Sequence, residues 1–382
     1  MAPAGSETVG LAEALELRAS PERAAEAVRS VSARVVALDT RYGARDTVDA
    51  AARAAARARG AVRTRLPDSA DVLAATAELH QVTGWVAFDA ERQRLSRRMT
   101  LTALDAARGA GDLSMEYFAL SQLAMQDVHL WRPTEARRVC EAALAAGTAG
   151  SVRTLFTLRL ARAVAQEGER TRARKLLGET LSRYLEGPRR GDPAWTWWLT
   201  EAEVTWHLAM VSADAGEPGT AAESFARTVE LVRADGRSAG AEEADGGGRF
   251  VFHAAVSLLW ALARARSWEE AEAVLVRDVL PRLGEVSSVR CERLLAEVVR
   301  RLDTARCPAG RGGPAGASAS RRTAALRLRS TWGSSCEPVS RTARRARTVA
   351  SPAVSRIRVT PMSPPPMARR SMSSSSTLTV LV

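Results

Sequence analysis

Four histidines are the side chains of this sequence best suited to catalysis or metal binding: His80, His129, His207 and His253. Each falls in a different predicted helical unit, about one repeat from the next. A zinc site needs three or four ligands that converge on one point. We therefore expect no metal centre.

No catalytic motif accompanies the histidines. The sequence lacks Gly-x-Ser-x-Gly, His-Glu-x-x-His and a P-loop, and its single lysine, Lys175, follows no glycine-rich loop. The cysteines, at positions 140, 291, 307 and 336, form no Cys-x-x-Cys pair. We predict a cytoplasmic protein that is no enzyme and uses no cofactor. An all-helical enzyme of unrecognised type is a distant alternative.

The elements that would position any site follow from a recurrence of small residues. Each small residue is the first of a set with further members four and, except in the last set, seven residues later. The sets are the triplets Ser96/Thr100/Ala103, Ala136/Cys140/Ala143, Ala173/Leu177/Thr180 and Ala221/Phe225/Thr228, and the pair Ala271/Leu275. Twelve residues earlier stand Gly84, Ala124, Ala161, Ala209 and Leu259. Small residues at both places let two helices cross closely, so each unit predicts a helical hairpin. Such hairpins bury their apolar faces only by stacking.

The pattern resembles the tetratricopeptide repeat over roughly residues 70–302. Gly168 and Gly216 lie five residues before their anchors, where the family has glycine, while Trp131 and Arg266 take that place in their units. The resemblance implies an all-α, right-handed α-solenoid of stacked antiparallel hairpins, assigned to residues 67–304. An irregular all-helical domain is the alternative, because alanine is abundant.

A second resemblance rests on Leu38-Asp39-Thr40-Arg41-Tyr42-Gly43 and on segments 83–89 and 192–198. These are similar to bacterial regulators that join an XRE-type helix-turn-helix domain to a tetratricopeptide array. Only residues 1–37 precede the first motif, which is too few for that DNA-binding domain. The chain thus resembles the sensor region without the DNA-binding domain.

The family register implies that the first helix of each hairpin lines the concave face. Trp and Met there offer adaptable contacts to a peptide or small effector, an arginine at residue 162 can hold a carboxylate or phosphate, and a histidine at 129 can respond to pH. Packing between repeats is the alternative role for these side chains. The candidate binding residues are Gln81, Trp85, Met125, His129, Arg162, Trp206, Met210 and Trp260.

The chain's charge is unevenly distributed. Residues 306–382 hold 14 Arg, no Lys and one Glu, which gives this segment a net charge of +13. The whole chain has a net charge of +12, so residues 1–305 carry −1. We expect no specific nucleic-acid binding by residues 1–305, no membrane anchor and no signal peptide. Residues 305–382 form a low-complexity basic tail, for which disorder, a nucleic-acid or membrane-surface arm, and a shifted reading frame remain open.

Residues 1–66 are assigned to an N-terminal helical segment, with helices expected over 21–37 and 46–59 and an end at Gly60. The leading hypothesis is a sensor that binds a peptide, protein or small-molecule effector in transcriptional regulation, with a homodimer as one arrangement. The alternative is a DNA-binding regulator whose helix-turn-helix is degenerate or supplied by a partner.

Overall fold

The chain forms α-helices that pair into antiparallel hairpins. A computed structural model describes Leu11 and residues 20–65, 69–238, 248–283, 286 and 288–304. The predictions for the tail at 305–382 therefore lie outside the described residues. Within these ranges the only β-type pairing is one isolated bridge between Leu283 and Val286.

The hairpins follow one another along the chain, each with a first and a second helix. In order they are α2 (Pro21–Tyr42) with α3 (Val48–Arg65), α4 (Ala70–Asp89) with α5 (Gln93–Ala110), α6 (Leu113–His129) with α7 (Pro133–Ala145), α8 (Gly150–Gln166) with α9 (Arg170–Leu185), α10 (Glu201–Asp214) with α11 (Pro218–Ser238), and α12 (Gly248–Ala265) with α13 (Trp268–Val274). A short 3-10 turn, η1 (Ala194–Trp198), precedes α10, and η3 (Leu275–Val279) and η4 (Leu280–Arg282) lead from α13 to α14 (Val289–Thr304).

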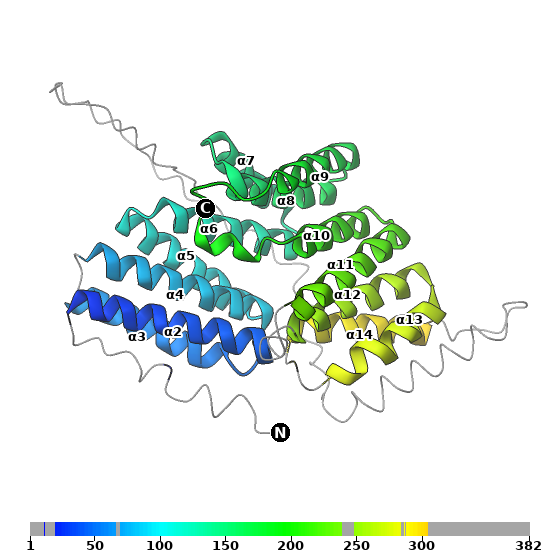
Figure 1. Ribbon diagram of the computed structural model, residues 1–382, viewed down its shortest axis with the longest axis horizontal. Coiled ribbons are helices and arrows are strands. Elements are labelled where there is room, and N and C mark those ends of the chain that lie inside the picture. The colour runs from blue at the N-terminus through cyan, green and yellow to red at the C-terminus, as the bar shows by residue number, and fades with distance from the viewer. Residues whose placement is uncertain are drawn as a thin grey trace, which may run out of the picture.

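The stack bends into an arch. It rises from α2 and α3 at the lower left of Figure 1, passes over α7 to α9, and descends to α14 at the lower right. Helix α12 contacts α2, so the two ends of the stack meet. The predicted all-α solenoid of stacked hairpins is confirmed. None of the described helices has the length and apolarity of a membrane span.

The small residues lie where the helices cross, as predicted. Ser96 Oγ donates a hydrogen bond to the Gly84 carbonyl across the α4–α5 crossing, at 2.8 Å. A Cβ on Gly84 would come within 2.6 Å of Thr100 Oγ1, so any larger residue there would force Thr100 to shift. Ala136 and Cys140 are fully buried at the equivalent places of α7.

A left-handed turn ends the first helix of each of the five predicted hairpins. Gly168 and Gly216 have φ of 88° and 80°, and Glu91, Trp131 and Arg266, at the same place in their units, have φ of 56°, 58° and 65°. Side chains disfavour this conformation by roughly 1–2 kcal/mol relative to glycine. The turn geometry is therefore kept even where the sequence signature is not.

Two expectations for the N-terminal helices were wrong. Helix α2 begins at Pro21 as predicted, but it continues to Tyr42. Gly43, whose φ is 85°, caps its C-terminus. Helix α3 passes through Gly60 to Arg65. A mid-helix glycine costs about 1 kcal/mol, and the burial of Ala58 and Val62 on either side offsets it.

Candidate functional site

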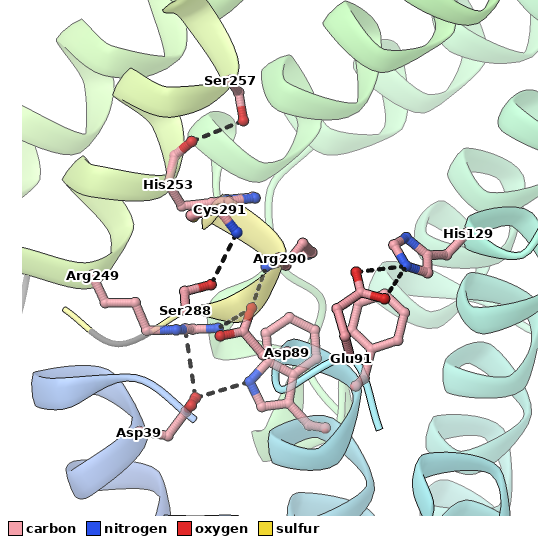
Figure 2. Close-up of polar contacts among 12 residues, drawn as sticks. Asp39, Asp89, Glu91, His129, Arg249, His253, Ser257, Ser288, Arg290 and Cys291 are labelled. Carbon is pink, nitrogen blue, oxygen red and sulfur yellow. Dashed lines mark hydrogen bonds and ion pairs between the residues drawn. The ribbon is translucent and has the colours of Figure 1, made fainter. Parts of the chain in front are cut away.

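The ends of the arch meet at a cluster of four buried charges (Figure 2). Arg249 of α12 lies 3.6 Å from Asp39 Oδ2 of α2 and 3.8 Å from Asp89 Oδ1 of α4. Arg290 of α14 approaches Asp89 Oδ1 to 2.9 Å. We call Asp39, Asp89, Arg249 and Arg290 the closure cluster. Asp89 is 1% exposed and Arg290 12%, so these pairs are largely shielded from water.

Helix-end electrostatics explain why these residues need one another. Asp39 and Asp89 lie in the last turns of α2 and α4, where the helix dipole disfavours negative charge. Arg249 and Arg290 are the second residues of α12 and α14, where it disfavours positive charge. Each end is unfavourable alone, and the two ends compensate each other on contact. Burial raises the pKa of Asp39, and the attraction of Arg249 opposes that shift.

Trp85, a predicted binding residue, contacts three of the four charged side chains of the closure cluster. Its Nε1 donates to Asp39 Oδ2 at 3.0 Å. The guanidinium carbons of Arg249 and Arg290 lie 5.2 and 5.6 Å from its ring centroid, a cation–π arrangement. Trp85 therefore contacts charges from both ends of the arch.

His129 lies beside the closure cluster. Its Nε2 is 3.0 Å from Glu91 Oε1, and Arg293 of α14 reaches Glu91 Oε2 at 3.2 Å. Its ring packs edge-on against Phe88, with centroids 4.8 Å apart. Burial lowers the pKa of His129, and Glu91 opposes that shift. Phe88 thus contacts both His129 and Trp85, whose ring centroid lies 5.8 Å from its own.

A second group of predicted residues lies on α8 and α10. Arg162 stands over the Trp206 ring, 5.8 Å from its centroid, with Asp214 Oδ2 3.5 Å from its Nη2. Trp206 Nε1 donates to Ser257 Oγ of α12 at 3.1 Å. Met210 packs against the same apolar core as Trp206.

Three predicted residues remain, and one of them, Trp260, belongs to the apolar core against which Trp206 and Met210 pack. Gln81 is fully buried, and neither polar atom of its side-chain amide has a hydrogen-bond partner among the residues that the structure describes. Met125 is also buried. Trp260 faces α14, donates from Nε1 to Glu297 Oε2 at 2.9 Å, and carries the Arg264 guanidinium above its ring.

The most informative feature is a row of buried polar atoms that lack partners. We call α2, α4, α6, α8, α10, α12 and α14 the inner helices. Among the described residues, such atoms occur on the second helices only at Thr100. On the inner helices they belong to Asp39, Thr76, Gln81, Asp89 (its Oδ2 atom), Gln122, Gln126, Arg159, Arg162, Gln166, His207, His253 and Arg290.

Sequence reasoning missed the closure cluster and further members of this row. Asp39, Asp89, Arg249 and Arg290 come from segments far apart in sequence, and Arg159 and His207 are one helical position off the candidate register. Acids at helix C-termini and arginines at helix N-termini were the available signal. The described residues contain no group of three His, Cys, Asp or Glu side chains that could hold a metal ion.

Comparison with known proteins yields one structural similarity of note. No protein-family model matches the sequence, and no curated protein does. The crystal structure of a Rap protein complexed with competence and sporulation factor superposes with a TM-score of 0.44. The sequences are 10% identical, and the match covers 85% of this chain and 96% of that chain.

Proposed function

We propose that this protein is a non-enzymatic regulatory receptor that binds a peptide or small polar effector along its inner helices. The supporting observation is the row of unpartnered polar atoms. A buried polar group without a hydrogen bond costs about 1–3 kcal/mol, and native proteins contain few of them. Their concentration on one set of helices favours a shared polar occupant over random imperfection of packing.

The resemblance to sensor regions of XRE-type regulators makes transcriptional regulation the proposed context. In this proposal the chain recognises the effector and does not itself read DNA, since residues 1–305 carry a net charge of −1. Sequence-specific DNA binding by the purified chain at physiological salt would contradict this assignment.

A pair of isosteric substitutions on one hairpin tests the proposal. Gln81→Leu removes two unpartnered atoms from inner helix α4, and Thr100→Val removes one from second helix α5. The full-length protein is screened against peptide and metabolite libraries by thermal shift, and hits are titrated calorimetrically. We expect Gln81→Leu to weaken binding at least tenfold and Thr100→Val to leave it unchanged. Equal affinities of both variants for every hit would refute the inner-helix site.

A further inference from the structure

Arg159 has a buried guanidinium without a carboxylate partner in the described part of the chain. It lies on inner helix α8 and is 4% exposed, and its Nε has no hydrogen-bond partner. No carboxylate of the described residues forms an ion pair with it. Among the described residues, its one polar contact is between Nη1 and His207 Nε2 of α10. Buried charges are normally paired. The Arg159 guanidinium departs from this rule, because some of its N–H donors have no acceptor among the described residues.

The contact with His207 cannot satisfy both partners. Glu203 Oε1 lies 3.1 Å from the same Nε2 atom. If Nε2 accepts from Arg159, it holds no proton to donate to Glu203, and two acceptors face each other. If Nε2 carries a proton for Glu203, two donors face each other at Arg159. One nitrogen cannot serve both neighbours, so either Arg159 lacks an acceptor or Glu203 lacks a donor.

Other features favour an anion as that acceptor. Arg162 lies one turn further along α8, with Asp214 at a long 3.5 Å and its own Nε unpartnered. Burial lowers the pKa of Arg159 to about 10; the charge of Glu203 opposes this shift, and the charges of Arg162 and Arg290 add to it. The Arg159 guanidinium carbon lies 5.9 Å from the Trp198 ring centroid, and Arg162 stands over Trp206. Two aromatic rings thus flank the two cations.

We propose that Arg159 and Arg162 form an oxyanion site, which holds a carboxylate or phosphate of the effector on inner helix α8. This inference rests on the proposed function and adds the chemical class of its ligand. An oxyanion accepts the donors of Arg159, and His207 then carries its proton on Nε2 and donates to Glu203. Arginine suits this role because its planar fork matches oxyanions bidentately.

The test compares wild type with Arg159→Met in the full-length protein. Melting temperature is followed against succinate and against inorganic phosphate, with sodium chloride at matched ionic strength as the reference. Arg153→Met, on the same helix and partly buried, is the control. We expect the melting temperature of wild type and of Arg153→Met to rise with anion concentration and to saturate. This rise should be lost in Arg159→Met, because one charged hydrogen-bonding partner contributes about ten- to a hundred-fold in affinity. The anion that acts identifies carboxylate or phosphate as the source.

Two further readouts separate a binding role from a packing role. Without ligand, Arg159→Met should melt no lower than wild type, because it removes a charge that lacks an acceptor. Imidazole ¹⁵N NMR should show His207 adopt the Nε2–H form when the anion binds. Should Arg159→Met not fold, Arg159→Lys keeps the charge without the fork and should weaken the response at least tenfold.

An equal anion response in wild type and the Arg159 variant would overturn the oxyanion site, as would no saturable response in wild type. An effector from the library screen that binds Arg159→Met as tightly as wild type would also overturn it. Such an effector, if Gln81→Leu weakens it, leaves the proposed receptor function standing.

Discussion

Replacing Arg290 by methionine should open the arch without unfolding its halves. The change removes the 2.9 Å contact to Asp89, a carboxylate that is 1% exposed, and leaves only Arg249 at 3.8 Å to compensate it. Breaking a buried ion pair from one side costs about 3–5 kcal/mol. Loss of the cation–π contacts of Arg290 with Trp85 and Phe88 adds about 0.5–2 kcal/mol.

This free energy acts on closure because each end of the arch has its own core. Buried residues of α2 to α5 form one apolar cluster, and those of α10 to α14 form another. We therefore expect unchanged helical circular dichroism, together with a larger radius of gyration by small-angle X-ray scattering. Urea denaturation should show an early transition that wild type lacks.

Two comparison variants make the closure prediction refutable. Arg227→Met removes an exposed arginine that pairs with Glu201 and Glu230 on the surface, and should cost less than about 0.5 kcal/mol. Asp89→Asn combined with Arg290→Met removes both charges and should recover at least about 1 kcal/mol of the single-variant loss. An unchanged scattering profile for Arg290→Met, or strict additivity in the double variant, would show that the cluster does not hold the ends together.

Three further outcomes follow from the described geometry. Trp131→Gly should stabilise the protein by about 1 kcal/mol in urea denaturation, because Trp131 has φ of 58° and is 66% exposed; no gain over Trp131→Ala would contradict this reasoning. Gly84→Ala should destabilise by about 1–3 kcal/mol through its clash with Thr100 Oγ1, and Gly84→Ala with Thr100→Ala should recover part of that loss. Burial lowers the pKa of His80 to about 4, so between pH 6.5 and 4 this residue binds a proton in the unfolded chain but not in the folded chain. The free energy of unfolding should therefore fall as pH drops through this range, by on the order of 3 kcal/mol for this residue. An equally steep pH dependence of unfolding in His80→Gln would exclude His80 as its source.

The hairpins could be predicted because their packing is local. The crossing of α4 and α5 depends on Gly84, Ser96 and Thr100, which lie within 17 residues, and helical periodicity relates such positions directly. Cys140 illustrates the same point: it is the second residue of the triplet that begins at Ala136, and it is fully buried. Burial also raises the pKa of that thiol.

The meeting of the two ends could not be predicted in the same way. It depends on small rotations between successive hairpins, which accumulate over the whole stack. The spacings between successive anchors, 40, 37, 48 and 50 residues, depart from any single repeat geometry. Candidate residues chosen by register alone therefore included Trp260, which faces α14, and omitted Arg249 and Arg290, which reach the opposite end.

The residues that local rules disfavour nevertheless identify where the ends meet. Asp39 and Asp89 oppose the dipoles of their own helices, Arg249 and Arg290 oppose theirs, and Glu91 adopts a left-handed φ of 56° without being glycine. A sequence that specifies one structure normally agrees with itself at every level, and departures concentrate at functional or strained positions. Here each of the three acidic residues pairs with an arginine about 200 to 210 residues away in sequence: Arg249 for Asp39, Arg290 for Asp89 and Arg293 for Glu91. Unfavourable helix-end charges of opposite sign in distant segments are thus a sequence signal for closure of a helical array, which repeat register alone does not contain.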